Sequence, residues 1–335
     1  MKLSLKKTSR DVKGKRTIQQ WFIIKIKQLS LFTSHAPLCY KTAMKQVLVL
    51  INPKSGIGGP YRFISAIEKV WDTPEHDISF QFSQSAEDGI GKTKRAIERG
   101  TKTILVVGGD GMVNSIGCAL VGTDARLGVI PAGSGNGFAR HFQIPLHPDD
   151  AAKALLGGRT QRIDVGKAND RLFFVTCSMA WDGALVEGFE KLGFRGGLAP
   201  YILAGAQQLL EYKAQPFQVE IDGEHLDFKH PLIFTVANLS QYGSDVLVAP
   251  DAKADSGHLE LIAIEKNDMP LVISHIHRFI EKTFHHHPLV THRQFKTMTV
   301  QRKSASPIQI DGELMKAETN VHIEVLPGAL NVIVP

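Results

Sequence analysis

The segment Thr103-Ile-Leu-Val-Val-Gly-Gly-Asp-Gly111 places a short apolar run directly before a glycine-rich loop, and a helix-like stretch follows from Asn114. A buried strand that leads through a tight loop into a helix is the building unit of a parallel α/β sheet. Backbone N–H groups at the start of such a helix favour a phosphate. Asp110 would repel an unshielded phosphate, so the loop predicts either Mg²⁺ or a hydrogen-bond donor beside this carboxylate. A structural turn is the alternative interpretation.

Two further glycine loops follow apolar runs, Asn52-Pro-Lys-Ser-Gly-Ile-Gly-Gly59 and Pro131-Ala-Gly-Ser-Gly-Asn136. Glycines let backbone amides approach an anion closely, while Ser55 can donate a hydrogen bond and Lys54 can supply a compact positive charge. The first of these loops, taken alone, is also a good turn. All three loops lie at carboxyl ends of expected strands, where open α/β sheets bind ligands, so one shared phosphate site is the economical explanation.

Apolar runs and helix-like stretches alternate up to about residue 165, which predicts a parallel sheet with helical crossovers. We expect strands near 46–51, 77–82, 102–107 and 127–131, and helices near 60–71 and 87–99.

From about residue 170 the pattern changes to strand-like runs broken by turns, with helical insertions near 198–212 and 270–283. This pattern predicts a mainly antiparallel β domain. The expected strands are Leu172–Cys177, Gln218–Ile221, Leu232–Ala237, Leu259–Ile264, Met298–Gln301, Ile308–Ile310 and Val321–Val325.

The net charge of +6 is concentrated at the start of the chain. Residues 1–45 contain 11 Lys or Arg and the single acid Asp11, a net charge of +10, so the remaining residues carry −4. A nucleic-acid-binding domain would carry basic residues on the fold itself, so we expect no nucleic-acid partner. We interpret residues 1–43 either as a disordered tail or product of an upstream start codon, or as a basic amphipathic anchor on anionic lipid.

No stretch reaches the roughly 20 apolar residues of a membrane-spanning helix, because lysines interrupt the run from Trp21 to Ile26. The same lysines argue against a signal peptide. The cysteines are far apart and lack metal-ligand spacing, so neither a zinc site nor a disulfide framework is predicted for Cys39, Cys118 and Cys177. These features favour a reducing, cytoplasmic location, with peripheral membrane association left open.

Eight motifs occur in the order and spacing of the diacylglycerol kinase catalytic domain and of the domain that follows it. They are Asn52-Pro-Lys-Ser-Gly56, Gly108-Gly-Asp-Gly111 with Asn114, Pro131-Ala-Gly-Ser-Gly-Asn136 with Phe138-Ala-Arg140, Asp164-Val-Gly166, Ala249-Pro-Asp-Ala252, Asp255-Ser-Gly-His-Leu-Glu260, Ile308-Gln-Ile-Asp-Gly-Glu313 and Leu326-Pro-Gly-Ala-Leu330. Over about residues 44–335 the chain therefore resembles the diacylglycerol kinase and sphingosine kinase superfamily.

The resemblance implies an α/β nucleotide-binding domain, like that of phosphofructokinases and NAD kinases, followed by a mainly antiparallel β-sandwich. The active site would lie in the cleft between them. On this basis we assign residues 44–168 to the α/β domain, 169–325 to a lipid-substrate domain, and 326–335 to a C-terminal segment that returns to the first domain.

The resemblance also implies an ATP-dependent lipid kinase that uses Mg²⁺ and transfers the γ-phosphate of ATP to a hydroxyl of a diacylglycerol-like or sphingoid lipid. Asp311 would be the general base, and Glu313 would hold the metal together with Asp110 or orient the base. Asp182 matches an aspartate linked to recognition of the lipid headgroup. The ATP and phosphate site would comprise Asn52, Lys54, Ser55, Gly56, Gly108, Gly109, Asp110, Gly111, Asn114, Gly133, Ser134, Gly135 and Asn136.

Some positions depart from the family pattern. Met112 stands where the family usually has threonine, and Ser115 stands in place of a glutamate, so ATP or Mg²⁺ binding would be weaker. A glycine expected before the headgroup aspartate is Ala180. The Asp-Gly turn of a structural magnesium site in some members is Ser256-Gly257 here, where the adjacent Asp255 could substitute.

The tetrapeptide Ile-Asp-Gly-Glu occurs twice, at 221–224 and at 310–313. Asp-Gly between alternating apolar residues predicts a hairpin turn. Equal turn chemistry predicts that Asp222 and Asp311 make similar, small contributions to stability. Only the family order singles out the second copy as catalytic.

The run His285-His-His287, with His292 nearby, raises the question of a metal site. Consecutive residues point in different directions, so adjacent histidines seldom converge on one ion. We therefore expect a solvated loop.

Two other functions stay open. One is an NAD kinase-like kinase for a small soluble molecule, because that class shares the Gly-Gly-Asp-Gly loop; the pattern from Ala249 to Leu330 argues against it. The other is a non-catalytic nucleotide- or lipid-binding protein, which Met112 and Ser115 favour. The sequence does not name the lipid, and it leaves open whether the chain forms a homodimer.

Overall fold

The first sheet begins in the chain with β1 (Lys45–Ile51), whose last five residues are apolar and buried. The computed structural model describes residues 44–54, 56, 59–181, 212–243, 246–268 and 283–335. β1 pairs in parallel with β2 (His76–Phe82) and β3 (Thr103–Gly108), and β3 pairs in parallel with β4 (Arg126–Pro131). The predicted parallel sheet is confirmed, in the order β2-β1-β3-β4.

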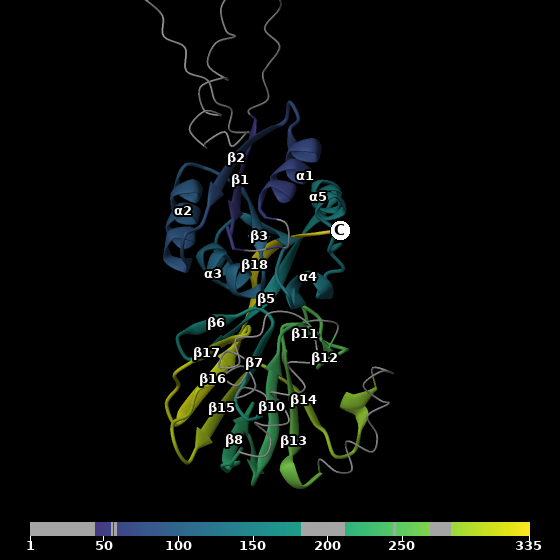
Figure 1. Cartoon of the computed structure of the whole chain (residues 1–335). Helices are drawn as coiled ribbons and strands as arrows, with labels where there is room; N and C mark the ends of the chain where they lie inside the picture. The colour runs from purple at the N-terminus through teal and green to yellow at the C-terminus, as the bar shows by residue number, and fades with distance from the viewer. Residues whose placement is uncertain (1–43, 55, 57–58, 182–211, 244–245, 269–282) are drawn as a thin grey trace, which may run out of the picture. The chain divides into compact units, whose positions relative to one another are not determined.

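Helices cover both faces of this sheet. α1 (Tyr61–Trp71) packs against α5 (Pro148–Gly157), and α2 (Ala86–Glu98) packs against α3 (Asp110–Leu120). Figure 1 shows these two pairs on opposite sides of the sheet. In the order β2-β1-β3-β4, the chain goes from β1 to one neighbour and then to the other, so the strand order reverses between β1 and β3. Open α/β sheets form a ligand-binding crevice at such a point.

The helix after the central glycine loop begins earlier than the sequence predicts. We expected it from Asn114, but α3 begins at Asp110 because Gly109, in an extended conformation, occupies the N-cap position. The backbone N–H groups of the first turn of α3 consequently belong to the glycine loop itself. These groups lack helical partners and can bind a ligand.

The first sheet continues beyond β4 through one long strand, β18 (Asn320–Val334). Its end pairs in parallel with β4 at Asn331 and Val332, and its other edge pairs antiparallel with β5 (Arg159–Ala168). β15 (Thr297–Arg302), β8 (Phe217–Ile221) and β9 (Glu224–Phe228) extend the sheet from the beginning of β18. β18 therefore runs across the boundary that the sequence places at residue 325.

A second sheet of six strands packs against this extension. Its order is β14-β13-β10-β7-β16-β17, and each pair of neighbouring strands is antiparallel. Alternate residues of β8 and β15 are buried, and they share one apolar core with residues of β10 and β13. The predicted β-sandwich is confirmed. The strands are β7 (Thr176–Ser178), β10 (Pro231–Ala237), β13 (Leu259–Glu265), β14 (Thr291–Phe295), β16 (Ile308–Ile310) and β17 (Glu313–Met315).

The strand expected at Leu172–Cys177 is two strands. β6 (Arg171–Phe173) pairs with β5, and β7 pairs with β10 and β16 in the other sheet. The chain bends between them at Phe174 and Val175. This bend passes the chain from one sheet to the other, so the continuous apolar run misled the prediction.

Three family motifs meet at one buried carboxylate, Asp164 of β5. Its Oδ1 accepts a hydrogen bond from the Gly328 N–H at 2.8 Å, and its Oδ2 accepts one from the Gly257 N–H at 2.6 Å. Asp164 is 2% exposed, so these bonds satisfy a charge that water does not reach. We infer a structural role for this motif.

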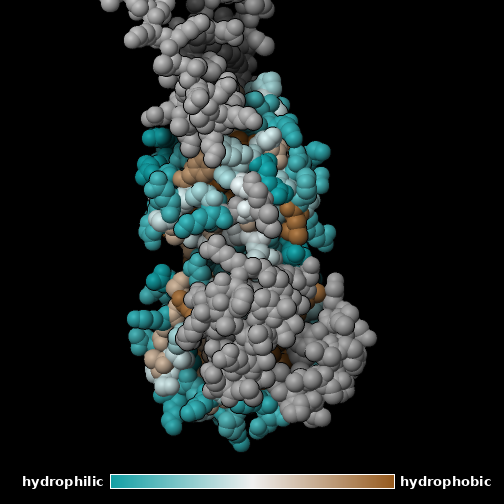
Figure 2. All heavy atoms as spheres, viewed as in Figure 1, coloured by the Kyte–Doolittle hydropathy of each residue, from teal (hydrophilic) through white to brown (hydrophobic). Residues whose placement is uncertain are grey.

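Residues 1–43 and most of the helical insertions expected near 198–212 and 270–283 lie outside the described residues. In the part of the chain that the structure describes, no helix has the length and apolar character needed to cross a bilayer. Figure 2 shows hydrophilic side chains over most of the described surface on this face, with apolar residues between them.

Candidate active site

The loops after β1, β3 and β4 meet at the carboxyl edge of the parallel sheet, as the sequence predicts. The loops after β3 and β4 touch through backbone, because a Cβ added to Gly133 would lie 2.6 Å from the Gly109 Cα. The Ala132 N–H also donates to the Gly108 carbonyl oxygen at 2.9 Å. Glycine at 109 and 133 is therefore required for the spacing of the two loops.

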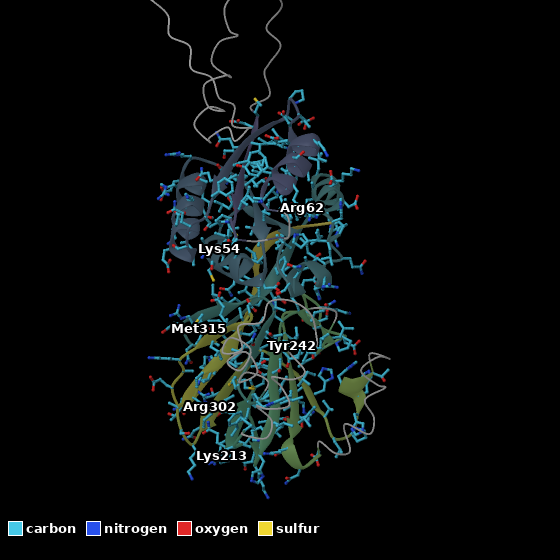
Figure 3. The ribbon with its side chains drawn as sticks, in the orientation of Figure 1. Lys54, Arg62, Lys213, Tyr242, Arg302 and Met315 are labelled. Atoms are coloured by element: carbon cyan, nitrogen blue, oxygen red, sulfur yellow. The ribbon has the colours of Figure 1, made fainter. Side chains whose placement is uncertain are left out.

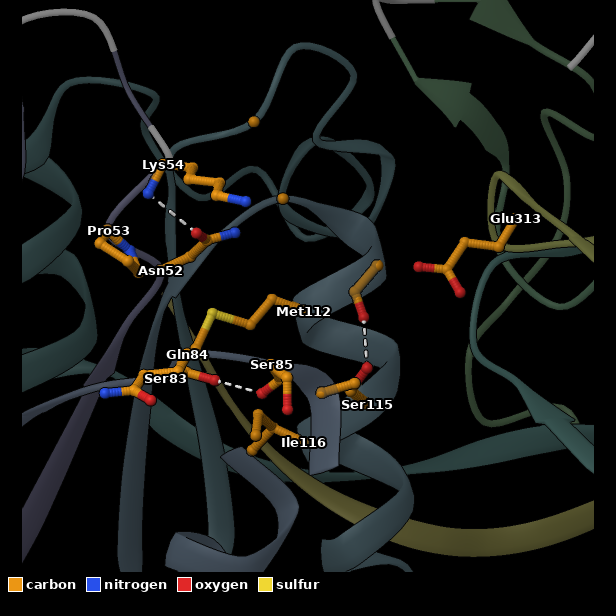
Figure 4. A pocket seen from close by; sticks show the side chains of 14 residues that line it. Asn52, Pro53, Lys54, Ser83, Gln84, Ser85, Met112, Ser115, Ile116 and Glu313 are labelled. Carbon is orange, nitrogen blue, oxygen red and sulfur yellow. Dashed lines mark hydrogen bonds between the residues drawn. The ribbon is translucent and has the colours of Figure 1, made fainter. Parts of the chain in front are cut away.

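A cavity of about 420 Å³ opens in front of these loops (Figure 4). Lys54 and the first turn of α3 both line it, so a positive side chain and unpaired helix N–H groups face the same space. Asn52 Oδ1 accepts a hydrogen bond from the Lys54 N–H at 2.9 Å, which fixes the turn that carries the lysine. The cavity suits phosphate groups. Its lining is Asn52, Pro53, Lys54, Ser83, Gln84, Ser85, Ala86, Gly109, Gly111, Met112, Ser115, Ile116, Gly133 and Glu313.

One wall of this cavity, residues 83–86, is a loop that sequence reasoning missed. It follows β2, and the strand order places it beside the loop after β1, where the Ser83 N–H donates to the Ile51 carbonyl oxygen at 2.8 Å. Ser85 caps α2 by accepting a hydrogen bond from the Asp88 N–H at 3.2 Å. The Ser-x-x-Asp cap directly after an expected strand was the available signal.

A second cavity, of about 260 Å³, shares Gly109, Gly111 and Gly133 with the first. The two cavities thus adjoin at the Gly-Gly-Asp-Gly loop. Figure 3 shows Lys54 in the α/β domain and Tyr242 in the β-sandwich half of the protein. The remaining lining residues are Asp110, Ser134, Gly135, Val175, Thr176, Tyr242, Gln309, Asp311 and Gly312.

Sequence reasoning did not find Thr176, Tyr242 or Gln309 as lining residues. Tyr242 lies on β11 (Gln241–Gly243), which packs against α4 (Gly137–His141). Gln309 is 6% exposed, and its Oε1 has no hydrogen-bond partner in the described part of the chain. Only the β-sandwich brings these side chains to the glycine loops, so no local pattern could reveal them.

Asp110 is held by hydrogen-bond donors. Its Oδ2 and Oδ1 accept the backbone N–H groups of Gly137 and Phe138, each at 3.0 Å, so the carboxylate caps α4. Burial raises the pKa of Asp110, although these bonds act in the opposite direction. Of the two conditions predicted for this aspartate, the structure meets the second, a donor beside the carboxylate.

Two predicted phosphate ligands serve other partners. Asn114 Nδ2 donates to Asp311 Oδ2 at 2.8 Å and to the Leu172 carbonyl oxygen at 3.1 Å, so both of its amide hydrogens are used. Asn136 accepts from the Gly133 N–H at 2.9 Å and donates to the Gly133 carbonyl oxygen at 2.8 Å. Neither side chain lines the two cavities. Asn114 positions Asp311, and Asn136 holds the third glycine loop.

Asp311 is the most enclosed acid of the site. Each of its oxygens accepts two N–H groups, at 2.8 to 3.0 Å, and the donors are Asn114 Nδ2 and the backbone of Phe174, Val175 and Thr176. Burial nevertheless raises the pKa of Asp311 to about 6, against the effect of these hydrogen bonds. A carboxylate with a pKa near neutrality is suited to general base catalysis. Its lone pairs are occupied, so a substrate hydroxyl must replace one donor.

The duplicated tetrapeptide forms two hairpins with the same backbone. Asp222 and Asp311 have φ values of 46° and 47°, and the glycines that follow have 89° and 90°, as the predicted turn requires. Their surroundings differ. Asp222 lies at the surface, where hydrogen bonds from Thr297 and Lys296 outweigh burial and lower its pKa. The expectation of equal, small contributions to stability is therefore wrong, because only Asp311 is a buried charge.

Glu313 extends toward the first turn of α3 (Figure 4). A Cβ added to Gly111 would lie 2.7 Å from Glu313 Oε1, so glycine at 111 makes room for this carboxylate. Within the described residues we find no hydrogen bond or ion pair of the Glu313 side chain. Glu313 is thus an available carboxylate at the first cavity.

The other predicted positions divide into three groups. Ser55 and Asp182 lie outside the described residues. Gly56 has a φ of 81° and packs against Phe63, so it shapes the first loop. Met112 and Ser115 both line the first cavity, and the Ser115 hydroxyl donates to the Gly111 carbonyl oxygen at 3.0 Å.

The fold and the site define a two-domain protein, with a parallel sheet that helices cover on both faces and a β-sandwich that places an aspartate beside the glycine loops. Two family models match this arrangement: "Diacylglycerol kinase catalytic domain" over residues 46–168 and "YegS C-terminal NAD kinase beta sandwich-like domain" over residues 177–334. Residues 46–168 are therefore a diacylglycerol kinase catalytic domain, the catalytic domain of a family of lipid kinases, as the motifs predict.

Curated relatives carry the same name. A diacylglycerol kinase of Staphylococcus carnosus is 27% identical over 276 residues, which cover 80% of this chain and 89% of the relative. One of Staphylococcus aureus is 28% identical over 276 residues, 80% of this chain and 86% of the relative. The crystal structure of a putative diacylglycerol kinase from Bacillus anthracis covers 88% of this chain and 99% of its own, with a TM-score of 0.72 and 22% identity. The last comparison establishes the fold alone.

Proposed function

We propose that the protein transfers the γ-phosphate of ATP to a hydroxyl group of a lipid of the diacylglycerol or sphingoid type. The observation that carries the proposal is the junction of two cavities at the Gly-Gly-Asp-Gly loop. The first cavity offers donors for phosphate, and the second contains the buried carboxylate of Asp311. Phosphoryl transfer requires a donor and an acceptor on either side of one phosphate-binding element.

The first cavity would hold the nucleotide. Lys54 and the first-turn N–H groups of α3 would bind its phosphates, and the loop at residues 83–86 would contact the nucleoside. Positioning and neutralisation of charge supply most of the rate enhancement in phosphoryl transfer. These residues are fixed by strand ends and helix caps, so little reorganisation is needed.

The second cavity would hold the acceptor hydroxyl. Asp311 would accept its proton, and of the four donors to this carboxylate the Asn114 amide is the one that a side-chain rotation can withdraw. The three backbone donors are fixed by the chain between β6 and β7. The incoming hydroxyl would therefore replace Asn114 on Oδ2.

The apolar character of an acceptor fits the surroundings of the second cavity. Tyr242 and Val246, each 38% exposed, belong to the hairpin of β11 and β12 (Val246–Leu247). The apolar chain of a lipid would pack on these exposed side chains. The substrate would then be taken from a membrane surface to which the protein attaches peripherally.

A magnesium ion fits the residues of the first cavity in part. Mg²⁺ prefers carboxylate oxygens and water, and Glu313 offers a carboxylate without another partner among the described residues. Asp110 is less suited than the sequence implies, because both of its oxygens accept backbone N–H groups. When bound, the ion would neutralise charge on the transferring phosphate.

ATP turnover in the presence and absence of lipid micelles separates this function from its rivals. A lipid kinase consumes ATP with Mg²⁺ only when an acceptor lipid is present. Turnover with NAD or another soluble acceptor and none with lipid would indicate a small-molecule kinase instead. ATP binding without turnover under any of these conditions would indicate a non-catalytic binder.

A further inference from the structure

A cluster of three side chains on the β-sandwich lies apart from both cavities. Asp251 comes from the loop between β12 and β13, and His285 and His286 come from the 3₁₀ helix Phe284–His286 that precedes β14. The solvated loop expected here is a wrong prediction for His285 and His287, which are 3% and 7% exposed. The tight turn directs one imidazole inward and leaves its neighbour outside, yet both reach the same carboxylate.

The potential ligand atoms are close together. His285 Nε2 and His286 Nε2 lie 2.7 and 3.7 Å from Asp251 Oδ2, and one ligand atom from each residue lies within 4.8 Å of the others. An ion with bonds of about 2.0 to 2.2 Å in a tetrahedral site holds its ligand atoms roughly 3.3 Å apart. Small side-chain movements would bring the three atoms to this spacing. The exposed Asp251 and His286 leave a route for the ion and for a water ligand.

On its buried side, the cluster contacts residues of β13 and β14. The His285 ring packs edge-to-face on His292, with ring centroids 5.4 Å apart, and His292 Nε2 lies 2.6 Å from Glu260 Oε2 on β13. His285 is nearly fully buried, and its Nδ1 has no hydrogen-bond partner among the residues that the structure describes. A buried ring nitrogen without a hydrogen-bond partner is unusual in a folded protein, and such atoms often mark functional positions.

We propose that Asp251, His285 and His286 form a binding site for a divalent transition-metal ion, with Zn²⁺ as the best-suited ion. Two imidazoles and one carboxylate are ligands that Zn²⁺ favours, whereas Mg²⁺ and Ca²⁺ favour oxygen ligands only. None of the three residues lines the cavities of the proposed kinase site. The ion would join the loop before β13 to the turn before β14 and so stabilise the sandwich.

The test is a Zn²⁺ titration of the full-length, tag-free protein against a competing chromophoric chelator. His286→Ala and Asp251→Asn alter exposed side chains, so both variants should fold. Without metal, His286→Ala should melt at the wild-type temperature, whereas Asp251→Asn keeps an oxygen beside the buried His285 Nε2 and should melt close to it. Removal of a ligand should weaken Zn²⁺ binding by at least the ~100-fold that loss of an outer-shell partner can cost. His147→Ala is the matched control, because His147 lies 3.8 Å from the carboxylates of both Asp149 and Asp150 without a second imidazole.

The proposal requires wild type and His147→Ala to bind one Zn²⁺ with equal affinity and to melt at a higher temperature with Zn²⁺. With the wild type and His147→Ala, Co²⁺ should give the visible absorption of a tetrahedral ion with nitrogen and oxygen ligands. With His286→Ala and Asp251→Asn it should not. Equal Zn²⁺ affinity in all four proteins would place the ion elsewhere and overturn the proposal. So would the absence of Zn²⁺ binding by the wild type.

Discussion

Replacement of Asp311 by asparagine should remove catalysis and change the pH dependence of stability, and the structure allows both effects to be worked out. The carboxylate accepts four N–H groups, whereas an amide in its place accepts two at most. Each buried donor left without a partner costs ~1–3 kcal/mol, so two of them lower the free energy of unfolding by ~2–6 kcal/mol.

Loss of the buried charge offsets part of this cost at neutral pH. Burial raises the pKa of Asp311 from 3.8 to about 6, which corresponds to ~3 kcal/mol between the two protonation states. The folded protein binds the Asp311 proton more tightly than the unfolded chain does, so protonation of this group stabilises the fold. Its contribution to the free energy of unfolding is complete below pH 3.8 and is lost as the pH rises through 6. At pH 7 the variant should therefore lie between ~1 kcal/mol more stable and ~3 kcal/mol less stable than the wild type, and at pH 4 it should be ~2–6 kcal/mol less stable.

Lipid phosphorylation and urea unfolding, measured on the same preparations, check the argument. Asp311→Asn should lower kcat by ~10²–10⁴, the usual contribution of a general base, with ATP binding little changed. Asp222→Asn is the matched control, since its hairpin has the same backbone at the surface, and it should keep its activity. If folded Asp311→Asn turned over lipid at nearly the wild-type rate, or if both variants lost activity equally, Asp311 would not be the base.

Three further outcomes are expected. The kcat of the wild type should rise with pH through a value near 6, because Asp311 must be ionised to accept a proton, and a profile without this rise would argue against it. Gly133→Ala should weaken ATP binding more than ~10-fold, because its Cβ would lie 2.6 Å from the Gly109 Cα. Gly157→Ala is the control and should bind ATP normally, because its Cβ would have no atom within 4 Å. Equal ATP affinity of the two variants would refute the role of the contact between the glycine loops. Deletion of residues 1–43 should leave activity in detergent micelles unchanged and reduce binding to anionic vesicles, most at low salt; equal vesicle binding would indicate a tail without this role.

The α/β half of the fold was predictable from sequence because its signals are local. Each buried strand is a run of apolar residues, and each glycine loop follows such a run directly, as in β1 and β3. The β-sandwich was predicted in class but less well in its strands. β9 and β14 are polar edge segments, and their alternation is hidden by charged residues and histidines. The bend at Phe174 and Val175 is imposed by Asp311, which is distant in sequence.

The site was predictable where the glycine loops of the parallel sheet form it and not where the β-sandwich contributes side chains. Lys54, Gly109 and Gly133 line the first cavity as expected. The partners of Asn114 could not be foreseen, because its amide bonds an aspartate 197 residues away. The family order named Asp311, but its hydrogen bonds and raised pKa follow from the packing of the sandwich on α3.

Transfer of phosphate from ATP to a lipid hydroxyl is the activity that we propose for this protein. Incubation of the purified chain with ATP labelled in the γ-phosphate, Mg²⁺ and mixed micelles of single candidate lipids tests it most directly. We expect label in the organic extract with diacylglycerol or a sphingoid base, and none with Asp311→Asn. Label that stays in the aqueous phase with every lipid, from a protein that binds ATP, would rule out lipid phosphorylation.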